Sequence, residues 1–223
     1  MAEADASPVA RGLRWLTTVP ATLSVCGLLL LVFAVERYVW TTMDYRTFVT
    51  LFVATPRPSP GWLLAPLAHL PTDPRHVLSS VAQLVVFGGL AEHRLGRREY
   101  LALLAVSGVA TTAAQVTGGA VVDAGDPVSG TLGASGIALA ATALVVVDSL
   151  RYRLTAGDWH GEVTWLWTLF GAFVVGRAAL DLVVGDPNVG VVGHLTGIVI
   201  GLGFGLMRPI EAVLRSGAPD SAR

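Results

Sequence analysis

The stretch PVSGTLGASGIALAATALVVV, residues 127–147, contains no charged side chain. A transmembrane helix needs about 20 predominantly apolar residues, because each residue adds about 1.5 Å along the helix axis. The stretch meets this length without help from its flanks, and it therefore predicts a helix that crosses a membrane.

Five other uncharged stretches occur along the chain, at residues 15–35, 77–91, 100–122, 163–176 and 187–207. The stretch 77–91 reaches spanning length only with His76 or Glu92, and 163–176 only with Arg177 and Asp181. Arg177 and Asp181 are four residues apart, so they can pair on one helix face. The prediction is an all-α membrane protein, a six-transmembrane-helix bundle over residues 15–208 with tails at 1–14 and 209–223.

Alternative folds fit the pattern poorly. The segment LLLLVFAV, residues 28–35, does not alternate apolar and polar residues as the strands of a membrane barrel do. A helical bundle in water would need polar outer faces, and these stretches lack them.

Composition and charge exclude several classes of function. Charged residues make up 14% of the 223 residues and hydrophobic residues 53%, and the formal net charge is −1. No basic field is present to bind nucleic acid. The single cysteine, Cys26, cannot form an internal disulfide or a CxxC metal site. Neither a P-loop nor an HExxH motif occurs, so we expect no metal or organic cofactor.

The arginines predict the orientation in the membrane. With six spans, ten of the fifteen arginines lie on the side that holds both tails, and five lie on the other side. Cytoplasmic loops carry the excess of basic residues. We therefore expect a multi-pass protein of the cell membrane, with the N- and C-termini in the cytoplasm.

Two loops are unusual. Residues 41–75 hold six of the twelve prolines and a short apolar run, FVTLFVA at 48–54, which indicates an interfacial or re-entrant element. Residues 118–136 are rich in glycine, which permits close approaches of the backbone.

A few polar groups stand out against the apolar background, and such groups inside a membrane are the first candidates for function. Ser135 opens the fourth span, and His194 lies early in the sixth. His76 opens the second span, with Ser80 one turn further on the same face. These three spans run in the same direction, from outside to inside, so all these groups can lie in the outer half of the bilayer. Ser135 and His194 then form a possible nucleophile and base, although small residues at 133–136 also suit helix packing.

Taken together, these residues resemble the rhomboid family of intramembrane serine proteases. GASG at 133–136 is similar to the family's nucleophile motif, and GHLTGIVIG at 193–201 to its last-helix motif. The second span adds His76, Phe87-Gly88, Glu92, Gly96 and Arg98 in the family's order. The resemblance covers residues 61–207.

The resemblance implies that Ser135 is the nucleophile and His194 the general base of a serine endopeptidase. It implies that His76, Ser80 and Gly133 lie around the oxyanion and the substrate. Transmembrane segments of other membrane proteins would be the substrates, and the site would open to the extracytoplasmic side. The sequence departs from the family pattern at Ser80, where asparagine is common, and at Leu139, where an aromatic residue is common.

Two other functions remain open at this point. The departures at Ser80 and Leu139 would also suit a catalytically weak or inactive relative that binds membrane clients. A small transporter is a third reading, with His194 and Asp181 as a proton relay, but no inverted repeat supports it.

Overall fold

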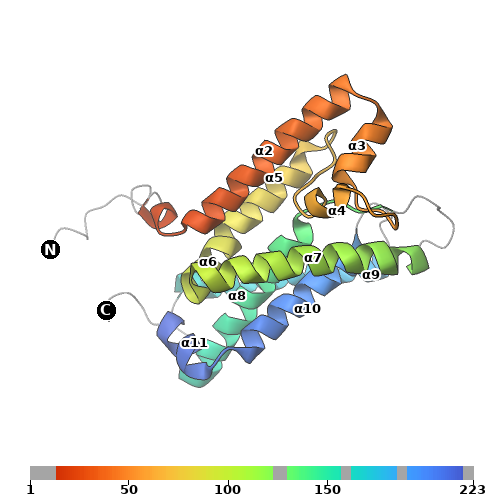
Figure 1. The fold of residues 1–223 in the computed structure, drawn as a ribbon. Helices are drawn as coiled ribbons and strands as arrows, with labels where there is room; N and C mark the ends of the chain where they lie inside the picture. Colours follow the sequence, from red (N-terminus) through yellow and green to blue (C-terminus); the bar gives the residue numbers. More distant parts are fainter. Residues whose placement is uncertain (1–13, 123–129, 157–161, 185–189, 218–223) are drawn as a thin grey trace.

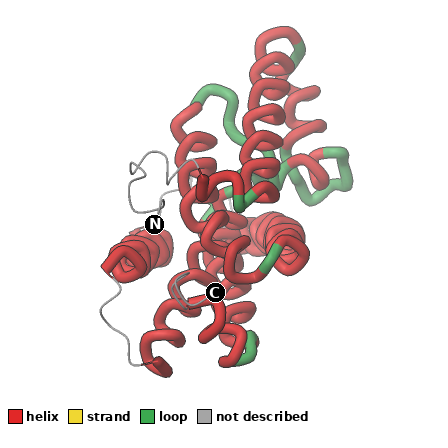
Figure 2. The backbone as a smooth tube through the Cα atoms, turned by 90° about the vertical axis from the view of Figure 1, so that its left-hand side faces the viewer, coloured by secondary structure: helices red, strands yellow, loops and turns green. Residues whose placement is uncertain are grey.

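The computed structural model describes residues 14–122, 130–156, 162–184 and 190–217. Within these ranges Figure 2 shows helices joined by loops. Ala54 and Thr131 pair as an isolated β-bridge. The named helices are α2 (Pro20–Thr42), α3 (Tyr45–Phe52), α4 (Gly61–Leu64), α5 (Pro74–Gln83), the π-helix η1 (Leu84–Gly88), α6 (Gly89–Leu95), α7 (Arg97–Val122), α8 (Ser135–Ala156), α9 (Glu162–Val184), α10 (Val191–Met207) and α11 (Ile210–Gly217).

The all-helical prediction is confirmed for the described residues. Two of their helices, Pro20–Thr42 and Arg97–Gly118, are long and apolar enough to cross a membrane, and Val191–Met207 is a shorter apolar helix. The count of six spans and the orientation of the termini stay predictions. The ion pair expected between Arg177 and Asp181 is present.

Helix α8 lies at the centre of the bundle and contacts α7, α9 and α10 (Figure 1). Its residues Ala138, Ala140 and Ala141 are fully buried, as are Thr142 and Leu144. A helix that is apolar on every side belongs in a core. Ser135 is therefore held at the first residue of a helix that is buried along much of its length.

Helix α10 packs against α8 through glycines. A Cβ on Gly197 would lie 2.2 Å from the carbonyl oxygen of Gly136, and a Cβ on Gly201 would lie 2.1 Å from that of Ala140. Any larger residue at either position would overlap the backbone of α8, so the sequence pattern of glycines four residues apart allows the two helices to touch.

Helices α5, η1 and α6 follow one another without a break and cross the bundle as one unit. At its far end Glu92 is buried, and its two carboxylate oxygens accept hydrogen bonds from the N–H groups of Ala21 and Thr22, at 3.0 and 2.7 Å. A carboxylate in this place satisfies N–H groups that the start of α2 leaves unpaired. Glu92 thus holds the start of α2 against α6.

The first long loop folds into the short helices α3 and α4 and packs on the bundle. The side chains of Phe48 and Phe52 are buried. The Phe48 ring packs edge-to-face on Trp40 of α2, with 5.2 Å between the ring centres. Neither helix is long enough to span a membrane, as the sequence predicted.

A candidate active site at the start of α8

The chain before Ser135 is fixed by the first long loop. Ala54 and Thr131 exchange two backbone hydrogen bonds of 3.0 and 2.9 Å, and the N–H of Gly133 donates to the carbonyl of Ala65 at 2.9 Å. Gly133 has φ +136°, a conformation that side-chain-bearing residues rarely adopt. These bonds explain why α8 begins at Ser135, well inside the uncharged stretch 127–147.

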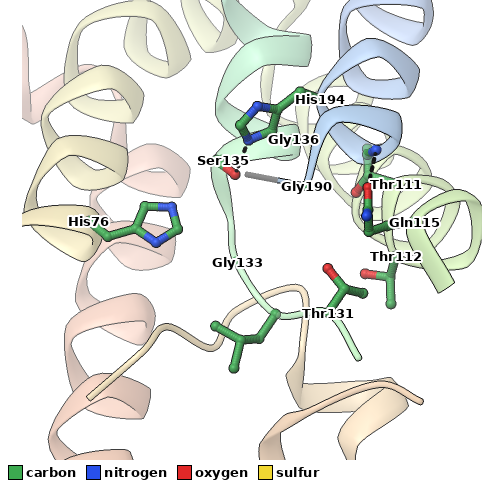
Figure 3. A pocket seen from close by; sticks show the side chains of 12 residues that line it. His76, Thr111, Thr112, Gln115, Thr131, Gly133, Ser135, Gly136, Gly190 and His194 are labelled. Atoms are coloured by element: carbon green, nitrogen blue, oxygen red, sulfur yellow. Dashed lines mark hydrogen bonds between the residues drawn. The ribbon is translucent and has the colours of Figure 1, made fainter. Parts of the chain in front are cut away.

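Ser135 and His194 meet at the top of the α8–α10 contact. Ser135 Oγ lies 2.7 Å from His194 Nε2, which is hydrogen-bonding distance (Figure 3). The other ring nitrogen, Nδ1, is buried and has no hydrogen-bond partner among the described residues. Within the described part of the chain the arrangement is a pair, without a carboxylate that would orient the imidazole as the third member of a triad does.

Unpaired N–H groups lie beside this pair. The first intrahelical bond of α8 runs from the N–H of Ala138 to the carbonyl of Ala134. The N–H groups of residues 135–137 therefore precede the hydrogen-bonded part of the helix, where such groups can stabilise an anion.

Ser135 and His194 open into a pocket of about 90 Å³. This volume exceeds the space that one water molecule needs, about 10–15 Å³, several times over. The lining residues are His76, Thr111, Thr112, Gln115, Thr131, Leu132, Gly133, Ser135, Gly136, Gly190, Gly193 and His194. Most of them present hydroxyl, amide, imidazole or bare backbone, so the pocket is suited to water and to a peptide group.

His76 reaches the pocket from α5, on the side opposite to α7 (Figure 3). Its ring lies against the backbone of Gly133, where a Cβ would be 3.5 Å from His76 Cε1. The structure thus brings together four of the five site residues that the sequence named: Ser135, His194, His76 and Gly133.

The fifth residue, Ser80, lies elsewhere. It is not among the residues that line the pocket, and only 2% of its surface is exposed. Its Oγ faces Nε2 of His69 at 3.4 Å, which is a long hydrogen bond. His76 and Ser80 lie one turn apart on α5, as the sequence predicted. Only His76 lines the pocket, and the Ser80 side chain lies behind it.

His69 itself was not singled out by the sequence. It belongs to the loop between α4 and α5 and is fully buried. Burial, with a smaller contribution from the nearby His76, lowers the pKa of His69 from 6.5 to about 4. The ring is therefore neutral at pH 7, with one nitrogen able to donate and the other to accept.

Gln115 is a second residue that sequence reasoning missed. Its Oε1 accepts a hydrogen bond of 2.9 Å from the N–H of Gly193, in the first turn of α10, and its side chain lines the pocket. The signal was present, because Thr111, Thr112 and Gln115 are polar groups at helical spacing within the apolar stretch 100–122.

Leu139, the other departure from the family pattern, is buried one turn after Ser135. It packs with Ala143 of α8, Ala178 of α9 and Ile198 of α10.

The part of the chain that the structure describes contains no group of three His, Cys, Asp or Glu side chains that could hold a metal ion.

This fold and site define a helical protein of membrane type with a serine and a histidine joined between two core helices. The family model of the rhomboid domain matches residues 61–209, which is more than half of the chain. The chain belongs to the rhomboid family. No curated protein matches it closely enough to name a relative.

Proposed function

We propose that this chain is an intramembrane serine endopeptidase, which cleaves peptide bonds in or near the transmembrane segments of other proteins. The observation that carries the proposal is the 2.7 Å contact between Ser135 Oγ and His194 Nε2 at the unpaired start of α8. A hydroxyl becomes an effective nucleophile when an adjacent base removes its proton.

The reaction follows from this contact. His194 Nε2 accepts the proton of Ser135 as Oγ bonds to the scissile carbonyl carbon, whose oxygen becomes negatively charged. The carbon–nitrogen bond then breaks, and the leaving amine takes the proton from His194. A water molecule, deprotonated by the same nitrogen, attacks the resulting ester, and Ser135 recovers its proton.

The oxyanion would be stabilised by the N–H groups at the start of α8 and by the His76 side chain, which lines the same pocket. Loss of one such donor typically raises the barrier by about 3–4 kcal/mol. The pocket has room for the water that hydrolysis consumes.

The proposal includes the membrane topology. Six spans with cytoplasmic N- and C-termini would place Ser135 and His76, at the starts of spans four and two, toward the extracytoplasmic side of the cell membrane. The substrate would be a transmembrane segment that unwinds locally, because the peptide bonds of an intact helix are hydrogen-bonded and shielded. Small or helix-destabilising residues near the cleaved bond would favour this step.

A fluorophosphonate probe tests nucleophilicity without knowledge of the substrate. We expect the purified protein in detergent to be labelled, and Ser135→Ala and His194→Ala to abolish labelling while the protein still folds. Ser24→Ala is the matched control, because the hydroxyl of Ser24 is exposed and donates to the carbonyl of Pro20 on α2. Labelling that persists in both dyad variants would contradict the proposal.

The second candidate is a relative without catalytic activity that binds membrane clients. It is favoured by the position of Ser80, whose side chain faces His69 and leaves the oxyanion one donor short of the family pattern. Absence of labelling, together with retained capture of a transmembrane client, would support this candidate.

A further inference from the structure

Three buried side chains, those of Glu36, His69 and Ser80, lie between α2 and the back of the pocket. Glu36 of α2 is fully buried, and its Oε1 accepts a hydrogen bond of 2.8 Å from the backbone N–H of His69. Beside it, Arg37 donates to the carbonyl of Pro71 at 2.9 Å. The loop that carries His69 is thus attached to α2 at two points.

The His69 ring meets α5 in two ways. Nε2 faces Ser80 Oγ at 3.4 Å, and the ring packs edge-to-face on His76, with 5.0 Å between the ring centres and 81° between their planes. Ser80 and His76 are one turn apart on the same helix. His69 therefore touches both residues, and it lies behind His76 as seen from the pocket.

The His76 ring has two neighbours in this region. The His69 ring packs on it edge-to-face, and Gly133 lies beside it, where a Cβ would be 3.5 Å from His76 Cε1. An oxyanion donor must be held close to its productive direction before the reaction, since a misplacement of about 1 Å costs about 100-fold in rate.

We propose that Ser80 and His69 are positioning residues for His76: the Ser80 hydroxyl fixes the His69 ring, and this ring holds the His76 imidazole toward Ser135. The inference rests on the proposed function, since the orientation of His76 has a consequence for rate only if Ser135 is a nucleophile. It gives Ser80 a role that requires no contact with the substrate.

This role differs from direct donation to the oxyanion in a way that can be measured. If Ser80 acts only through His69, the variant Ser80→Ala and the variant His69→Phe interrupt the same connection, and the double variant should be no slower than the slower single one. If Ser80 touched the substrate, the two losses would multiply.

The experiment combines kinetics with the NMR signals of the histidine rings. We expect Ser80→Ala and His69→Phe to lower the first-order rate constant of fluorophosphonate labelling about tenfold, with little change in the probe concentration that gives half the maximal rate. A tenfold loss corresponds to about 1.4 kcal/mol in the barrier. Ser80→Thr, which keeps the hydroxyl, should restore most of the rate. Ser79→Ala is the matched control, because the exposed Ser79 hydroxyl donates to the backbone carbonyl of His76 and not to a ring.

Protein labelled with ¹⁵N-histidine gives a readout that does not require activity. The ring signals of His76 should move in Ser80→Ala and His69→Phe and stay in place in Ser79→Ala. Unchanged His76 signals, or kinetic losses that multiply in the double variant, would overturn the inference. If the wild-type protein proves unreactive, the proposed function fails, whereas the NMR comparison still decides whether Ser80 and His69 position His76.

Discussion

Gly197 of α10 faces the carbonyl oxygen of Gly136 so closely that a Cβ at position 197 would lie 2.2 Å from it. Gly136 directly follows Ser135 on α8, and Gly197 lies three residues after His194 on α10. One of the close glycine contacts between the two helices therefore lies directly beside the 2.7 Å hydrogen bond of the dyad. The glycine contact sets the distance on which the proposed chemistry depends.

Replacing Gly197 with alanine should separate the dyad. The added methyl group overlaps backbone, which cannot rotate away, so α10 must move and the packing cost is about 1–3 kcal/mol or more. We expect fluorophosphonate labelling to fall by about 100-fold, because this is the typical effect of a shift of about 1 Å. Gly203→Ala is the control on the same helix, since a Cβ there meets nothing within 4 Å. Equal labelling of the two variants would show that the contact is not needed.

Removing the Gln115 amide should weaken the start of α10. In Gln115→Ala the buried N–H of Gly193 loses its acceptor, and a buried donor without a partner costs about 1–3 kcal/mol. Gln115→Glu, which keeps a carboxyl oxygen at the same reach, should lose less. Thermal unfolding in detergent measures both, with Thr117→Ala as the control because its exposed hydroxyl bonds only within α7. A melting temperature unchanged in Gln115→Ala would contradict the role of this bond.

Two ion pairs, Asp148–Arg208 and Arg177–Asp181, should differ in their importance. Asp148 pairs with Arg208, whose side chain is 9% exposed, whereas Arg177, the partner of Asp181, is 56% exposed. Asp148→Asn removes the carboxylate that pairs directly with Arg208, and breaking a buried pair typically costs about 3–5 kcal/mol. Arg177→Gln should cost under about 1 kcal/mol. Thermal unfolding of the two variants compares them directly, and similar losses would refute the distinction.

Stability should fall in mildly acidic solution because of His69. Its pKa is lowered by burial from 6.5 to about 4, so between these values the unfolded chain binds a proton that the folded protein excludes. The contribution of the neutral ring is complete above pH 6.5 and is lost as the pH falls toward 4, by about 3 kcal/mol in total.

The pH dependence is tested by the difference between wild type and His69→Gln. This difference in unfolding free energy should shrink between pH 6.5 and 4, whereas a variant of the exposed His93 should follow the wild-type profile. A parallel profile for His69→Gln would contradict a buried, neutral His69.

The proposed topology predicts which loops face outward. In a Cys26→Ser background, cysteines at the exposed positions Arg57 and Arg98 should differ in accessibility. A membrane-impermeant maleimide applied to intact cells should label position 57 and not position 98. The predicted second span separates positions 57 and 98, so they should lie on opposite sides of the membrane. Labelling of both positions from the same side would contradict the topology inferred from the positive-inside rule.

The apolar stretches and the few polar residues within them could be identified from the sequence alone. A helix must be apolar over about 20 residues to cross a bilayer, and this requirement leaves a pattern that needs no tertiary information. The same background made Ser135, His194 and His76 conspicuous, because a polar group in an apolar span requires a reason. The sequence also placed Ser135 at the start of a helix, whereas the bonds that hold this start, from Ala54 and Ala65 in a distant loop, are seen only in the structure.

The sequence by itself determined that the chain is helical and apolar, which polar groups are unusual, and the family to which it is similar. Only the tertiary structure decided which of these groups meet. It brought Ser135 and His194 to 2.7 Å, turned Ser80 toward His69, and added Gln115 to the pocket. The physical reason is that periodicity specifies the face of a helix, whereas the neighbour of that face depends on how closely other helices approach, and here glycine contacts between α8 and α10 set that approach.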